Sequence, residues 1–355
     1  MGGLALASGQ QDRDDAVGHG RYALGMAVGF LGLLLVLLCL PFDRYLASQR
    51  AADSEMFHAR WIYERLHFDP TPVDVAIIGS SRVEAGISSD LMARILSAKF
   101  HRQIHVVNLA LVKPGRDYHD LLVRDLLATH PEVRMIILSD DGFMIDTHPM
   151  FQEMASVAQI ASAPILINKS YFANLLAVPY RNLLNGAQQL LPGWFGVDTV
   201  FRPDNYLGSD LDRTLGYRLP SGHKRNGELV MPPKQLLARA QATIAERGKF
   251  RLLHMSILPE AWQLSIDHTY MESIAGLARD HHVALAFIGL PMFGPRDEPR
   301  NPAYFSRFGP DFLPVHLRND PRFYQDEVHL NRAGAIAATQ YLADKVAPLL
   351  SRVGV

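Results

Sequence analysis

The sequence predicts a parallel α/β domain that follows one N-terminal membrane-spanning helix. Two observations lead to this prediction. A long uncharged apolar run lies near the N-terminus, and further along the chain short apolar runs alternate with helical patterns. A repeated strand–helix–strand order is typical of a sheet whose strands are parallel.

The composition is that of a globular domain. The chain has 355 residues, of which 48% are hydrophobic, and a formal net charge of −1. A nucleic-acid-binding protein would normally present a basic face, so this class is not expected. The one cysteine, Cys39, excludes an intrachain disulfide and a zinc site built on cysteines. We expect neither a metal ion nor a cofactor.

Residues 22–42 read YALGMAVGFLGLLLVLLCLPF and carry no charge. A helix needs about 20 such residues to cross a bilayer. The run is too long for the core of a cleaved signal peptide, and the bulky Leu38 before Cys39 does not fit a lipoprotein signal. We therefore expect an uncleaved anchor, with residues 1–21 as a cytoplasmic tail. Arginines flank the run on both sides, so charge alone does not give its orientation.

The segment 43–70 that follows has helical patterning, and we interpret it as a stalk. The domain proper then spans 71–355. Its first strand, 73–78, is a β-branched apolar run between Pro72 and Gly79, as expected for a buried parallel strand. The alternation continues with a helix at 89–100, a strand at 104–110, a helix at 117–129 and a strand at 134–139.

The alternation stops between about 145 and 250, where Pro, Gly, Asn and aromatic residues are frequent. We interpret this part as an insertion that borders the site, with surface loops at 190–195 and 201–206. The α/β pattern resumes with a helix at 267–281, a strand at 283–291 and a last helix at 333–350.

The residues at the end of the first strand are the first candidates for chemistry. In "VAIIGSSRV" the apolar run ends at Gly79, and Ser80, Ser81 and Arg82 follow. Open α/β sheets bind their ligands at the carboxyl ends of strands. Taken alone, however, the stretch indicates only a strand that ends in a turn of small residues.

A second motif, "YQDEVHLNRAGA" at 324–335, contains Asp326 and His329 three positions apart. This spacing places both side chains on one side of a turn. The carboxylate can then orient the imidazole, whose free nitrogen can accept the proton of a serine hydroxyl. The alternative is that Asp326 caps the following helix and His329 is a surface residue.

Together, "IIGSSR" and "DEVHLNRAGA" resemble the SGNH/GDSL hydrolase superfamily over roughly 73–140 and 280–350. The resemblance implies a three-layer, flavodoxin-like parallel sheet. It also implies that Ser81 is the nucleophile, His329 the base and Asp326 the orienting acid. The backbone N–H groups of Ser81 and Gly115 would form the oxyanion hole. Ser80 is the other possible nucleophile, but the spacing of the family's motif favours Ser81.

The chain departs from the family in its third motif. Classical members have Gly-x-Asn-Asp there and use the asparagine as an oxyanion donor, whereas 138–143 here read LSDDGF. Ionised aspartates would repel an oxyanion, so this third donor stays unassigned. Arg82 and Asn108 are further candidates for substrate binding. For each of them a structural role, as an ion-pair partner or as a loop anchor, is the alternative.

The "GSSR" form of the first motif is closest to a membrane-anchored subset of the family. This subset comprises the SGNH-like proteins of alginate-type exopolysaccharide O-acetylation and the D-alanine transfer protein DltD. The resemblance implies an extracytoplasmic (periplasmic) domain anchored in a bacterial inner membrane. It also implies a membrane-bound O-acyltransferase partner and a polysaccharide or cell-envelope polymer as substrate. A plain carbohydrate esterase or deacetylase and a non-catalytic accessory protein are the alternatives.

Overall fold

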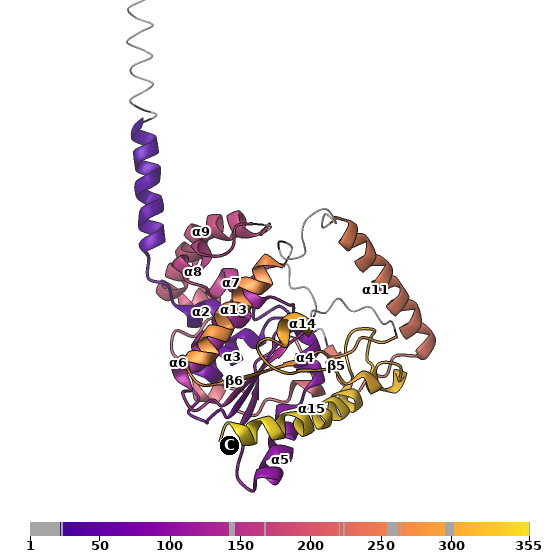
Figure 1. Ribbon diagram of the computed structural model, residues 1–355. Coiled ribbons are helices and arrows are strands. Elements are labelled where there is room, and N and C mark those ends of the chain that lie inside the picture. The colour runs from indigo at the N-terminus through magenta and orange to yellow at the C-terminus, as the bar shows by residue number, and fades with distance from the viewer. Residues whose placement is uncertain are drawn as a thin grey trace, which may run out of the picture.

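A five-stranded sheet forms the centre of the protein. The computed structural model (Figure 1) describes residues 22, 24–141, 146–166, 168–219, 221–222, 224–253, 262, 264–294 and 302–354. Every pairing in the sheet is parallel, in the order β2-β1-β3-β6-β7. The strands are β1 (Val75–Ile78), β2 (Val106–Asn108), β3 (Met135–Ser139), β6 (Ala284–Ile288) and β7 (Asp311–Phe312). The predicted parallel α/β sheet is thus confirmed.

Helices cover both faces of the sheet, which gives three layers. Alternate residues of β1 point to opposite faces, so that Ala76 and Ile78 join one core cluster while Val75 and Ile77 join the other. The first face is covered by α2 (Arg44–Gln49), α3 (His58–His67), α6 (Arg116–Thr129) and α13 (Ser265–Asp280). The second face is covered by α4 (Ser81–Gly86), α5 (Ser89–Phe100) and α15 (Arg332–Arg352).

The segment predicted as a stalk belongs to the domain. It forms α2 and α3, joined by turns. Leu46, Trp61 and Ile62 are buried, and Trp61 and Ile62 pack in the core on the first face of the sheet. A freestanding stalk would leave these side chains in water, so burial of its apolar positions draws the segment onto the sheet.

The chain between β3 and β6 contains more regular structure than its composition suggests. It forms α7 (Pro149–Met154), α8 (Val157–Ala161), α9 (Tyr171–Leu190), α10 (Pro192–Phe195) and α11 (Pro233–Leu253), with a hairpin of β4 (Gly216–Arg218) and β5 (Lys224–Asn226). The loop expected at 190–195 is instead the end of α9 together with α10. The loop expected at 201–206 contains one short 3-10 turn, Pro203–Asn205. A four-residue helix, α14 (Pro302–Phe305), lies between β6 and β7.

The N-terminal apolar run is helical over residues 24–39. Within the described part of the chain, no helix combines the length and the apolar character needed to cross a membrane. Residues 1–21, expected to form the tail, lie outside the described residues.

The order of the strands decides where a site can form. After β1 the chain crosses the second face through α4 and α5 to reach β2, and after β2 it crosses the first face through α6 to reach β3. The connections that leave β1 and β2 therefore diverge. In doubly wound sheets such a divergence opens a crevice at the carboxyl ends of the strands.

Candidate active site

A tight turn at Gly79 carries the chain from β1 into α4. A Cβ atom added to Gly79 would lie 2.7 Å from the Cβ of Ser139 and 2.9 Å from the Cβ of Val83. Only glycine fits this close to β3 without displacing backbone. Ser80 caps α4 by accepting a hydrogen bond of 3.3 Å from the N–H of Arg82, and Ser81 is the first residue of the helix.

Asp326 and His329 lie in a turn that precedes α15. The Oδ1 atom of Asp326 accepts the N–H groups of Val328 at 2.9 Å and of His329 at 2.7 Å, so the side chain closes the turn. The cap of α15 is Asn331, whose side chain accepts the N–H of Gly334 at 3.0 Å. The alternative role of Asp326 as the helix cap is therefore wrong.

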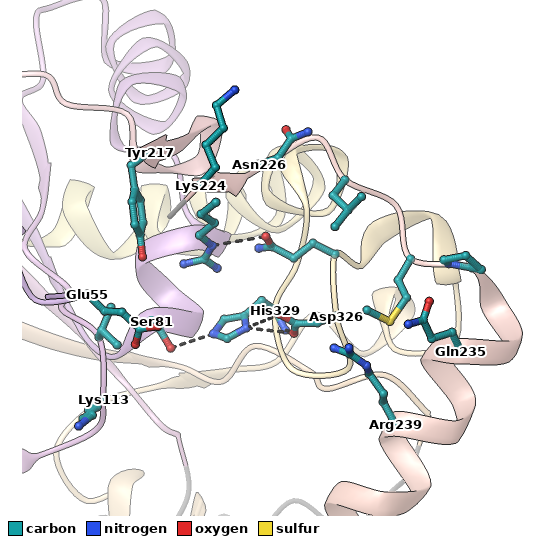
Figure 2. Close-up of a pocket in the computed structure, with 16 residues that line it drawn as sticks. Glu55, Ser81, Lys113, Tyr217, Lys224, Asn226, Gln235, Arg239, Asp326 and His329 are labelled. Carbon is teal, nitrogen blue, oxygen red and sulfur yellow. Dashed lines mark hydrogen bonds and ion pairs between the residues drawn. The ribbon is translucent and has the colours of Figure 1, made fainter. Parts of the chain in front are cut away.

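The structure brings the three predicted catalytic side chains into one hydrogen-bonded chain (Figure 2). The Oγ atom of Ser81 lies 2.8 Å from Nε2 of His329, and Nδ1 of His329 lies 3.0 and 2.9 Å from the two carboxylate oxygens of Asp326. Burial opposes ionisation of Asp326, but the hydrogen bond from His329 and the two backbone donors outweigh it and lower its pKa. An ionised Asp326 accepts the Nδ1–H of the ring, which leaves Nε2 free to accept the proton of Ser81.

A buried acidic residue of α4 is paired with two basic side chains from other parts of the chain. Glu84 accepts a hydrogen bond of 2.8 Å from Nδ1 of His58 and lies 3.3 Å from Nη1 of Arg213. Burial would raise the pKa of Glu84, but these two partners outweigh it and lower the pKa. Arg213 also donates to the carbonyl oxygens of Asn108 and Ala110. The guanidinium of Arg213 thus joins α4, the helix that carries Ser81, to the end of β2.

Asn108 is a loop anchor in this structure. Its side-chain amide donates to the carbonyl oxygens of Val83 at 3.1 Å and Ile87 at 2.8 Å, and it is 3% exposed. Arg82 is 6% exposed, and its guanidinium lies 3.8 Å from the carboxylate of Asp141. Neither side chain lines the pocket around Ser81, so the structural alternative fits both.

The loop after β2 borders the site. Gly115 is the N-cap residue of α6, where an added Cβ atom would lie 2.4 Å from the Cβ of His148, and its role as an oxyanion donor stays a prediction. His148 accepts the N–H of Met150 at Nδ1, so its Nε2–H donates to the carbonyl oxygen of Val112 at 2.9 Å. Burial lowers the pKa of His148 to about 4, so the ring is neutral at pH 7. His148 therefore holds this loop in place.

Lys113, in the same loop, has a φ of 75°. This left-handed conformation costs a non-glycine residue about 1–2 kcal/mol. The surrounding structure must compensate for that cost, as it commonly does near functional sites. The third motif ends β3 and continues with buried Asp140, whereas its residues 142 and 143 lie outside the described residues.

A pocket of about 640 Å³ opens above the triad (Figure 2). Figure 2 shows Tyr217 and Lys224 of the hairpin on one side of the pocket and Arg239 of α11 on another. Its cationic side chains are those of Lys113, Lys224, Arg225 and Arg239, and its carboxylates are those of Glu55 and Asp326. Among the charged side chains that line the pocket, positive charges are therefore in excess.

We expected the insertion to border the site, and its hairpin and α11 do line the pocket. Their local sequence does not indicate which of their residues reach Ser81. The ion pair between Glu84 and Arg213 joins positions 129 residues apart and leaves no pattern in the sequence. A buried charge beside the helix that carries Ser81 is visible only in three dimensions.

A scan against protein-family models and a search of the curated proteins each found no match to this chain. Among the described residues, no group of three His, Cys, Asp or Glu side chains is placed to hold a metal ion. The triad and the pocket are therefore the features that bear on the chemistry of the site.

Proposed function

We propose that this protein is a membrane-anchored, SGNH-like serine acyltransferase that O-acetylates an exopolysaccharide or a cell-envelope polymer outside the cytoplasm. The hydrogen-bonded chain of Ser81, His329 and Asp326 carries the proposal. The fold supports it as well. When the five strands of the sheet are numbered in chain order, they follow the flavodoxin-like order 2-1-3-4-5, and the triad lies at the carboxyl ends of the strands.

In the first half of the reaction, Oγ of Ser81 attacks the carbonyl carbon of an acyl donor while Nε2 of His329 takes the hydroxyl proton. The carboxylate of Asp326 stabilises the imidazolium that forms. The bond from the acyl carbon to the donor's oxygen then breaks, and His329 returns the proton to that leaving oxygen. The product is an acyl ester on Ser81.

In the second half, a hydroxyl group of the acceptor enters the same pocket. His329 takes its proton, the oxygen attacks the acyl carbon, and the bond to Oγ of Ser81 breaks as the serine regains a proton. The acceptor leaves as an ester and the enzyme is restored. Water in place of the acceptor gives hydrolysis by the same steps, so the two reactions differ only in what occupies the pocket.

The charge of the pocket favours an acceptor that carries anionic groups. Four cationic side chains face two carboxylates, one of which belongs to the triad. A cleft lined mainly by one sign of charge concentrates ligands of the opposite sign. Polymers with carboxylate or phosphate groups fit this pocket better than neutral sugars.

The proposed location follows from the apolar segment 22–42 and from the resemblance described above. Acetyl-CoA is not available outside the cytoplasm, so the acyl group must be handed across the membrane. A membrane-bound O-acyltransferase is the partner that can deliver it, and an anchor keeps the domain beside that partner.

The test is the acetyl content of the polysaccharide that cells produce with each variant, measured by NMR. Ser81→Ala removes the nucleophile and should abolish acetylation. Ser80→Ala is the matched control, because it removes a neighbouring hydroxyl whose bond is to the N–H of Arg82. Unchanged acetylation with Ser81→Ala would sink the proposal. Free acetate released without polymer esters would identify an esterase instead.

A further inference from the structure

Helix α9 turns polar side chains inward and apolar side chains outward, which is the reverse of an ordinary surface helix. Five polar side chains face inward and are buried, namely Asn174, Arg181, Asn182, Asn185 and Gln188. The outward positions are apolar and exposed, namely Phe172, Leu176, Tyr180, Leu183 and Leu190. A helix that faces water carries the opposite arrangement, with its apolar stripe on the core. The pattern indicates that the outward face of α9 does not face water.

The buried polar side chains of α9 form hydrogen bonds with neighbouring segments of the chain. Asn185 accepts the N–H of Asp43 and donates to its carbonyl oxygen, each at 2.8 Å. Arg181 donates to two backbone carbonyl oxygens in the segment 152–155, at 2.8 and 2.7 Å. These bonds fix the rotation of α9, so its apolar side is held outward by the fold.

The outward face carries no charge. The one charged residue among the twenty of α9 is Arg181, which is 3% exposed. The next helix, α10, adds Trp194, which is 85% exposed, and Phe195. Tryptophan and tyrosine are enriched where protein meets the boundary between lipid and water. A helix with such a face typically lies in the plane of that boundary.

The apolar N-terminal helix ends against α9. The side-chain amide of Asn182 donates to the carbonyl oxygen of Leu37 at 3.0 Å, and the guanidinium of Arg181 lies 4.1 Å from the ring of Phe42. Figure 1 shows the helix over residues 24–39 leaving the domain beside α9. Large apolar side chains of this helix, such as Phe30, are exposed. If this segment enters a bilayer, α9 is held at the surface of that bilayer.

We propose that the outward face of α9 and α10 binds the surface of the phospholipid bilayer, with its apolar side chains between the head groups and the upper acyl chains. This deepens the proposed function and rests on its membrane anchor. The two contacts together would fix the orientation of the α/β domain on the membrane, which a single flexible anchor would not do.

The experiment uses the full chain in vesicles of phosphatidylcholine and phosphatidylglycerol. In a Cys39→Ala background, Leu176→Cys carries an NBD fluorophore, and lipids with a doxyl quencher at acyl carbon 5 or 12 report its depth. We expect at least twofold quenching from carbon 5 and less from carbon 12. Leu237→Cys is the matched control, because Leu237 is a half-exposed leucine of α11, and its label should not be quenched.

A label at Phe30→Cys separates this proposal from the membrane anchor. Quenching at 30 without quenching at 176 would overturn the proposal while the anchor stands, and quenching at 176 alone would support the face without the anchor. A blue-shifted label at 176 that lipids do not quench would mean that a protein covers the face, which also overturns the proposal. If Leu176→Cys does not fold, Leu183→Cys reads the same face.

Discussion

Replacing Gly79 with alanine places a methyl group in the turn that leads to Ser81. The new Cβ atom would lie 2.7 Å from the Cβ of Ser139, roughly 1 Å short of the ~3.5–4.0 Å of an ordinary carbon–carbon contact. Neither atom can rotate away, so β1 must separate from β3. Overpacking of this kind costs about 1–3 kcal/mol of folding free energy. Ser81 lies two residues further on, and a displacement on the order of 1 Å can reduce a catalytic rate about 100-fold.

The assay is the turnover of p-nitrophenyl acetate by the purified full chain, together with its thermal unfolding. We expect Gly79→Ala to lower both the rate and the Tm. Adding Ser139→Gly removes the closest contact and should restore part of each. Gly276→Ala is the matched control, because nothing lies within 4 Å of the added Cβ in the middle of α13, and it should stabilise by about 0.5–1 kcal/mol. If Gly79→Ala matches the wild type in rate and Tm, the packing argument is refuted.

Three further predictions follow from the contacts of the site. Asp326→Asn should lower kcat on the same ester about 10⁴-fold at unchanged circular dichroism, because the amide does not hold the imidazole in the required tautomer; near-normal kcat would contradict this. Burial lowers the pKa of His148 to about 4, so native stability should fall by up to about 3 kcal/mol as the pH drops from 6.5 to 4. In melts across this range His148→Gln should show a shallower fall, and an equal slope would count against the assignment. Arg213→Ala removes a buried partner of Glu84 and should lower the free energy of unfolding, measured by thermal melts, by about 3–5 kcal/mol. Arg202→Ala, which removes the exposed partner of Asp198, should change the free energy of unfolding little.

Much of the sheet could be predicted because its strands are short buried apolar runs. The runs at 73–78, 104–110, 134–139 and 283–291 each contain a strand, and the helix predicted at 89–100 has the bounds of α5. β7 could not be predicted, because two residues at the edge of a sheet carry no periodic pattern. Helix α9 was missed for another reason: it contains Pro179 and its buried face is mostly polar, so its pattern is not that of a core helix.

The triad could be predicted because its parts lie in two short motifs. Asp326 and His329 are neighbours in one turn, and Ser81 follows a recognisable strand. Both side chains lie in one turn, as their spacing predicts, and Asp326 itself closes that turn by accepting the N–H of His329. The pocket walls come from a hairpin and a helix far along the chain, and such long-range contacts are set by the packing of the whole domain.

Covalent labelling with a fluorophosphonate probe tests the central claim most directly. Such a probe reacts with a serine only where a base activates its hydroxyl. Intact mass and peptide mapping of the labelled full chain should show one adduct, on Ser81, that is absent from Ser81→Ala and from His329→Ala and present in Ser80→Ala. An adduct on Ser80, or no adduct on a folded protein, would contradict the account.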